Sequence, residues 1–98
     1  MPYLIEILLP VTKTFERKTL DAIRGELTEA FGGVTTHAHA PAEGLWKEGG
    51  DTERDRIVVV EVMTEEVDRS WWADYRKRLE KQLSQEEIVV RLTHFHRL

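Results

Sequence analysis

The apolar residues of this chain fall into short aliphatic runs, which are typical of strands, and into spaced stripes, which are typical of helices. The runs that begin at Tyr3 and at Arg56 are nearly continuous, and each is broken by one acid, Glu6 and Glu61 respectively. Such runs predict strands in the middle of a sheet. A third run alternates apolar and polar residues and ends at Pro41, a pattern that favours an edge strand.

Two stripes of apolar residues recur at three- and four-residue spacing and predict amphipathic helices. They consist of Leu20, Ile23, Leu27 and Phe31 in the first helix, and of Trp72, Tyr75, Leu79 and Leu83 in the second. Gly32 follows the first stripe and supplies the positive-φ residue that commonly ends a helix. Asp68 and Ser70 are both suitable N-caps for the second helix.

Together these patterns predict the order β-α-β-β-α-β in one domain that spans residues 1–98. The fold class is therefore α+β, a ferredoxin-like sandwich with an antiparallel sheet of order 4-1-3-2 and both helices on one face. The expected strands lie near 3–9, 34–40, 56–63 and 87–95, and the expected helices near 17–31 and 70–84. The two most apolar strands then occupy the middle of the sheet, which supports this topology.

The side chains of a strand alternate between the two faces of its sheet, so the two acids decide which face the helices cover. Glu6 and Glu61 avoid the core only if they lie on the open face. That face then also carries seven large apolar side chains: Leu4, Leu8, Ile57, Val59, Met63, Val89 and Phe95. This is more contiguous apolar surface than a monomer leaves in contact with water. A second copy of the chain, a ligand or the segment around Trp46 must cover it, and we expect a homodimer.

Polar groups inside this apolar surround are the candidates for binding a small-molecule ligand. The set consists of Glu6, Thr35, His37, His39, Trp46, Glu61 and Arg91. Glu6 and Glu61 could share a proton as paired carboxylates, although a pair between Glu6 and Arg91 on neighbouring strands is the more ordinary arrangement.

The four histidines form two Thr-His-x-His pairs, His37 with His39 and His94 with His96. Residues two apart on a strand point the same way, so His37 and His39 could hold one metal ion if a carboxylate completed the site. Solvated or hydrogen-bonded histidines on an edge strand explain the same pattern. Alternation places the second pair on the opposite face, which argues against one four-histidine site within a single chain.

Composition and charge narrow the functional classes. The chain has 98 residues and a formal net charge of −4, which argues against a nucleic-acid binder. It has no cysteine, which excludes disulfides and thiolate chemistry and is consistent with a cytoplasmic protein. No apolar run approaches the ~20 residues of a membrane span, and the first residues lack the features of a signal peptide.

The segment Phe31-Gly32-Gly33-Val34-Thr35, the later Gly44-Leu45-Trp46 and the run Gln85-Glu86-Glu87-Ile88-Val89-Val90 resemble a pattern of small, uncharacterised bacterial single-domain proteins. The resemblance implies a ferredoxin-like domain and no particular activity. The architecture is also similar to that of dimeric α+β barrel proteins, some of which are cofactor-free oxygenases or stress proteins. None of their site residues matches a motif in this chain.

The sequence therefore favours a small self-associating domain that binds a small ligand or a protein partner on the open sheet face. The alternative is a small-molecule enzyme with an open-face cavity that uses Glu6, Glu61 or a metal bound by His37 and His39. A purely structural or regulatory module is a third reading. No residue pattern identifies a cofactor, a substrate or a catalytic group.

Overall fold

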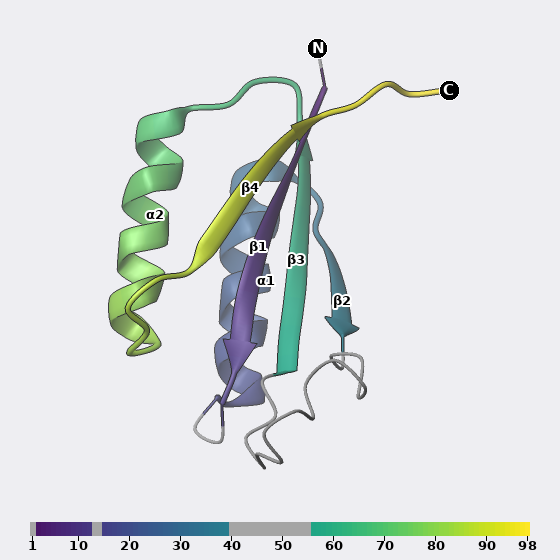
Figure 1. The fold of residues 1–98 in the computed structure, drawn as a ribbon. Coiled ribbons are helices and arrows are strands. Elements are labelled where there is room, and N and C mark those ends of the chain that lie inside the picture. Colours follow the sequence, from purple (N-terminus) through teal and green to yellow (C-terminus); the bar gives the residue numbers. More distant parts are fainter. Residues whose placement is uncertain (1, 13–14, 40–55) are drawn as a thin grey trace, which may run out of the picture.

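The computed structural model describes residues 2–12, 15–39 and 56–98. Its elements are, in chain order, β1 (Tyr3–Val11), α1 (Arg17–Phe31), β2 (Thr35–His39), β3 (Arg56–Thr64), α2 (Arg69–Gln82) and β4 (Val89–His94). The strands form one antiparallel sheet in the order β2-β3-β1-β4, and both helices lie on the same face of it (Figure 1). The α+β class is therefore confirmed. Read from its other edge, the strand order is the expected 4-1-3-2, with β1 and β3 in the middle.

The strand that begins at Tyr3 is two residues longer than the sequence predicts. Pro10, which lies beyond the expected strand of residues 3–9, continues β1 and has Ile57 of β3 as its Cα partner. The reason is that β4 ends its pairing with β1 at Leu8, so Pro10 has a neighbouring strand on one side only. A proline lacks a backbone N–H and is tolerated where no second strand needs that donor.

The other boundaries differ from the expected ones by at most two residues. α1 has the expected bounds, while β2 and β4 are shorter than predicted and α2 begins and ends slightly earlier. Residue 40, the expected end of the second strand, lies outside the described residues. Gly32 ends α1 with a φ of 91°, and its N–H donates to the carbonyl of Thr28 at 2.7 Å. Asp68 rather than Ser70 caps α2, because its carboxylate accepts from the N–H of Trp71 at 3.1 Å.

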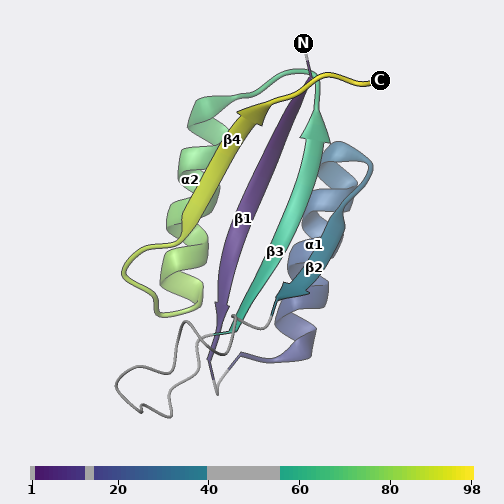
Figure 2. The ribbon, with the colours of Figure 1, turned by 45° about the vertical axis from the view of Figure 1, so that its right-hand side comes forward.

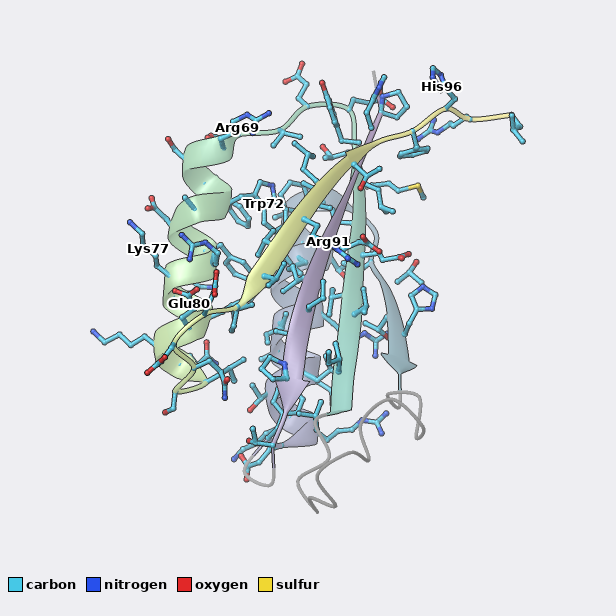
Figure 3. The ribbon with its side chains drawn as sticks, viewed as in Figure 1. Arg69, Trp72, Lys77, Glu80, Arg91 and His96 are labelled. Atoms are coloured by element: carbon cyan, nitrogen blue, oxygen red, sulfur yellow. The ribbon has the colours of Figure 1, made fainter. Side chains whose placement is uncertain are left out.

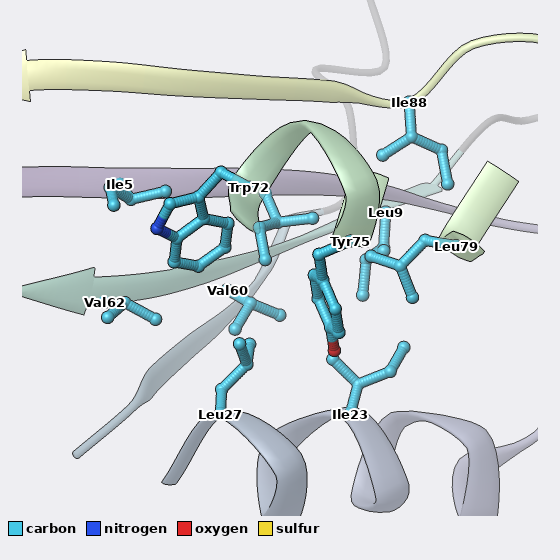
Figure 4. Packing of buried hydrophobic residues seen from close by; sticks show 11 residues of the cluster. Ile5, Leu9, Ile23, Leu27, Val60, Val62, Trp72, Tyr75, Leu79 and Ile88 are labelled. Atoms are coloured by element: carbon cyan, nitrogen blue, oxygen red, sulfur yellow. The ribbon is translucent and has the colours of Figure 1, made fainter. Parts of the chain in front are cut away.

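The core lies between the sheet and the two helices, as Figure 4 shows. It consists of Ile5, Ile7, Leu9, Ile23, Leu27, Val60, Val62, Trp72, Tyr75, Leu79 and Ile88. Every strand residue in this set belongs to the face that the alternation assigned to the helices. Leu92 belongs to the same face but is 36% exposed, because it lies at the β4 edge of the sheet. The two helices thus cover the middle of the sheet better than this edge.

Polar side chains tie the two helices to each other. The Tyr75 hydroxyl of α2 donates to a carboxylate oxygen of Glu26 on α1 at 2.9 Å, and Arg78 contacts the same oxygen at 2.9 Å. Burial, together with the carboxylate of Glu26, raises the pKa of the Tyr75 hydroxyl well above its ordinary value. The hydroxyl therefore stays protonated and remains a hydrogen-bond donor at neutral pH.

A second polar link joins α2 to the start of β4. One carboxylate oxygen of Glu80 accepts from the backbone N–H of Ile88 at 2.9 Å and pairs with Arg76 at 2.8 Å. Figure 3 shows Glu80 on the side of α2 next to the segment that enters β4. The N–H of Ile88, followed by the charge of Arg76, holds the pKa of the Glu80 carboxyl below its ordinary value of 4.5.

Replacing Leu27 with alanine should destabilise the fold strongly. Leu27 is fully buried, so its truncation removes apolar contacts and leaves a cavity, at a cost of about 2–5 kcal/mol. Urea unfolding monitored by circular dichroism measures the difference. The exposed Glu29→Ala variant on the same helix is the control and should change stability by less than about 0.5 kcal/mol. Equal effects of the two substitutions would contradict the described core.

Replacing Glu80 with glutamine should destabilise the protein at neutral pH and have a smaller effect in acid. Because the folded state lowers the pKa of Glu80, its charge stabilises the fold above pH 4.5, and this contribution is lost as the pH falls through the folded-state pKa. Unfolding midpoints of both proteins between pH 7 and pH 3 measure the difference. The exposed Glu86→Gln variant should show no such change. A difference for Glu80→Gln that stays constant across this pH range would contradict the assignment.

Candidate functional site

Four ionisable side chains, one on each strand, span the open sheet face, and we call them the ion-pair row: Arg91, Glu6, Glu61 and His37. His37 reaches Glu61 diagonally, because its own Cα partner on β3 is Val59. Glu6 of β1 has Arg91 of β4 as its Cα partner on one side and Glu61 of β3 on the other. An Arg91 nitrogen lies 3.2 Å from Glu6 Oε1, and His37 Nε2 of β2 lies 3.2 Å from Glu61 Oε1. The expected pair of Glu6 and Arg91 is therefore present.

The two carboxylates occupy the centre of the row and the two basic groups its ends. Like charges directly opposite each other on neighbouring strands destabilise a sheet. Here each acid is offset by a basic partner on its outer side, on an edge strand. The acids are also the better covered members, since the side chains of Glu6 and Glu61 are 19% and 25% exposed against 54% for Arg91 and 46% for His37.

Apolar side chains flank the row on both sides along the strands. Met63 is the Cα partner of Leu4 on one side, and Val59 is the partner of Leu8 on the other. With Val89 beside Leu8, these residues form an apolar face around the charges. The open face therefore has the composition that the alternation of the strands predicted.

Exposure on this face is uneven. Met63 is 56% and Val89 44% exposed, whereas Val59 is only 8% exposed. Val59 lies in a central strand with Leu8 and His37 as its Cα partners on the two sides, so its neighbours in the sheet already shield it. Figure 2 shows the sheet with both helices behind it and no described helix on its open face.

Three predicted site residues do not belong to the ion-pair row: Thr35, His39 and Trp46. Thr35 is exposed next to the row, since its Cα partner is Glu61. Trp46 and the side chain of His39 lie outside the described residues. The ion-pair row thus joins four of the seven candidates through two direct contacts, with Thr35 beside it.

The structure brings no metal-binding group together in the part of the chain that it describes. No set of three or more histidine, aspartate or glutamate side chains there is arranged to hold an ion. The rings of His94 and His96 are 5.4 Å apart at their centroids, and His94 also packs against Tyr3 at 5.4 Å. Because half of the proposed metal pair, His39, is not among the described side chains, a metal held by His37 and His39 stays a prediction.

Two surface features near α2 did not figure among the predicted sites. A depression of about 800 Å³ is bordered by the end of α1 and the start of α2, with Phe31, Trp71 and Trp72 in its wall. Trp71 is 37% exposed and stacks on Tyr75, with ring centroids 5.1 Å apart. A smaller cavity of about 160 Å³ separates α2 from β4. Arg69 borders both features, and Arg76 borders the smaller one.

Comparisons with protein-family models, with curated proteins and with solved structures yield no match to this chain. Neither helix of the described residues is both long and apolar enough to cross a membrane.

A double-mutant cycle on Glu6 and Arg91 should reveal a coupling free energy of about 0.5–1 kcal/mol. The pair is close, and Glu6 is mostly covered, so water screens it less than an exposed pair. The variants are Glu6→Gln, Arg91→Met and the double variant, compared by urea unfolding.

The matched control is the same cycle on Arg17 and Asp21, which lie 4.0 Å apart with side chains 84% and 56% exposed. We expect its coupling to be below about 0.5 kcal/mol, as for other exposed pairs of this spacing. A coupling in the control that equals or exceeds that of Glu6 and Arg91 would show that the row is an ordinary solvated surface.

Proposed function

We propose that this chain is a ferredoxin-like domain that forms a homodimer through its open sheet face, with the ion-pair row at the centre of the interface. The observation that carries the proposal is the apolar face that surrounds the row, in which Met63 and Val89 are about half exposed. The helices cover the other face of the sheet, and a second copy supplies the missing cover for this one. Closed two-fold symmetry is the common arrangement for a surface that pairs with itself.

The size of the face is suited to a dimer of moderate affinity. Four strands that are ~4.8 Å apart and about seven residues long, at ~3.3 Å per residue, cover roughly 400 Å² in each copy. Two copies then bury a footprint of roughly 800 Å², and side-chain relief increases the accessible area above it, which places the interface at the small end of specific interfaces, where about 1,200 Å² is the usual lower bound. We therefore expect dissociation in the micromolar range.

The charges on the face are compatible with burial. A lone carboxylate in an interface carries a large desolvation penalty, but each acid of the row already has a basic partner within its own chain. The row is electrically neutral when His37 is protonated and carries one negative charge otherwise. It therefore contributes specificity to the interface more than affinity.

Small-molecule binding or catalysis at the row is the second candidate, and the contact between His37 and Glu61 favours it. An imidazole oriented by a carboxylate, next to apolar residues, is an arrangement that general bases use. A dimer structure separates the two candidates. A dry, packed interface supports association alone, whereas a chamber lined by the row supports a ligand or a substrate.

We also infer a cytoplasmic location, because the chain has no cysteine and therefore forms no disulfide that would need an oxidising compartment. The resemblance to small bacterial single-domain proteins and to dimeric α+β barrels is consistent with the proposed dimer and adds no site residue to it.

Light scattering and analytical ultracentrifugation test the dimer. At roughly ten times the micromolar dissociation constant that we expect, the unmodified protein should have about twice the chain mass of 11.4 kDa. Met63→Lys, which places a charge on the exposed part of the open face, should shift the mass toward that of the monomer. Val59→Asp should do the same, provided that circular dichroism shows it to be folded.

The matched control is Ala22→Lys, which places the same charge at an exposed position of α1. It should leave the mass of the dimer unchanged. A monomeric mass of the unmodified protein at all accessible concentrations would refute the proposal. So would a dimer that tolerates Met63→Lys and Val59→Asp, since its interface would then lie elsewhere.

A further inference from the structure

The outer edge of β4 is available for strand pairing. β4 pairs with β1 on one side, and no strand of the described part of the chain pairs with it on the other. Natural proteins commonly protect such edges with a proline, a bulge or a very short strand. β4 is six residues long, contains no proline and keeps a continuous register with β1.

One hydrogen bond shows which backbone groups of β4 point outward. The N–H of Phe95 donates to the carbonyl of Pro2 at 3.2 Å, so these two residues form a hydrogen-bonded pair of the antiparallel ladder. Such pairs alternate along the strands. By this alternation the backbone of Val89, Arg91 and Thr93 is directed to β1, and the N–H and C=O groups of Val90, Leu92 and His94 are directed to the free edge.

The same alternate residues border a groove. The cavity of about 160 Å³ between α2 and the sheet is lined by Ile5, Val67, Arg69, Trp72, Ala73, Arg76, Val90 and Leu92. Leu92 is 36% exposed beside it. A strand added to this edge would therefore receive backbone hydrogen bonds from the residues whose side chains face the groove, and its own alternate side chains would enter the groove.

Two arginines in the wall of the groove favour an occupant with acidic side chains. Arg69 is exposed and has no ion pair among the described residues. Arg76, two helical turns further along α2, pairs with Glu80 through one guanidinium nitrogen, and its side chain stays 34% exposed. Figure 3 shows Arg69 at the end of α2 that lies near the end of β4. Arg76 lies near the start of β4, because its partner Glu80 accepts from the N–H of Ile88. Apolar residues line the groove between the two arginines. An extended segment with an apolar residue opposite Leu92 and acidic residues two positions away on either side matches this order of charges.

We propose that the edge of β4 and this groove bind an extended peptide of another protein as a fifth strand, with an acidic, apolar and acidic residue at alternate positions. A second copy of the chain fits less well. β4 is VVRLTH and contains no acid, so a second copy paired along this edge would offer no carboxylate to Arg69. The proposal uses the edge of the sheet and is independent of the dimer through the open face.

The probe is an acetylated and amidated heptapeptide, Thr-Glu-Thr-Leu-Thr-Glu-Thr, added to the full-length ¹⁵N-labelled chain. We expect slower amide hydrogen exchange at Val90, Leu92 and His94, while their alternate neighbours, already bonded to β1, change little. When about nine-tenths of the protein is bound, exchange at these three amides should be about tenfold slower, because only the free protein exchanges.

Two peptides and one variant provide the controls. The isomer Thr-Thr-Glu-Leu-Glu-Thr-Thr, with its acids on the other face of the strand, should bind several-fold more weakly. Arg69→Glu should weaken binding of the probe at least several-fold and improve binding of Thr-Lys-Thr-Leu-Thr-Lys-Thr. Because Arg69 is exposed, this variant should fold normally, which circular dichroism verifies.

Three results would overturn the proposal. The first is the absence of any change at the three amides in millimolar probe. The second is equal binding of the two isomeric peptides. The third is protection of these amides that increases with protein concentration in the absence of peptide, since this would identify a second copy of the chain as the occupant.

Discussion

The structure depends on the register between β1 and β3, which sets Glu6 directly opposite Glu61. Side chains alternate along both strands, so this one pairing places both acids on the same face and leaves Ile5, Ile7, Val60 and Val62 on the other. A slip of one residue in either strand would turn its apolar set to water and its acid into the core. The burial of these aliphatic residues under the two helices therefore maintains the register, and the two acids exclude the alternatives.

The same constraint creates the candidate site. Two carboxylates held opposite each other repel, and the sheet compensates by placing Arg91 on one neighbouring strand and His37 on the other. Both helices pack on the other face of the sheet, so neither covers this face and its apolar residues. Fold stability and the proposed association thus have a common origin, because both follow from the division of the sheet into an aliphatic face and a face with a charged centre.

The second proposed surface has a different cause. Trp72 and Tyr75 give α2 large side chains for its contact with the sheet, and Glu80 ties the helix to the start of β4 through the N–H of Ile88. α2 therefore covers the middle of the sheet and the entrance to β4, while Leu92 at the edge stays partly exposed. The groove with Arg69 at its border results from this arrangement, and it lies apart from the open face.

Much of the fold follows from the sequence alone, because the period of the apolar residues reflects which side of each element is buried. It determined both helices, the division of the two central strands into faces, and the outward direction of Glu6 and Glu61. Tertiary structure decided the rest. Pro10 belongs to β1 because β4 ends its pairing before it, and His37 meets Glu61 because β2 pairs with β3 in one particular register. The exposure of Leu92 and the groove beside it depend on where α2 rests on the sheet. The alternation of apolar and polar residues shows which side chains of one strand share a face. Contacts between strands and the position of a helix depend instead on the packing of the whole chain.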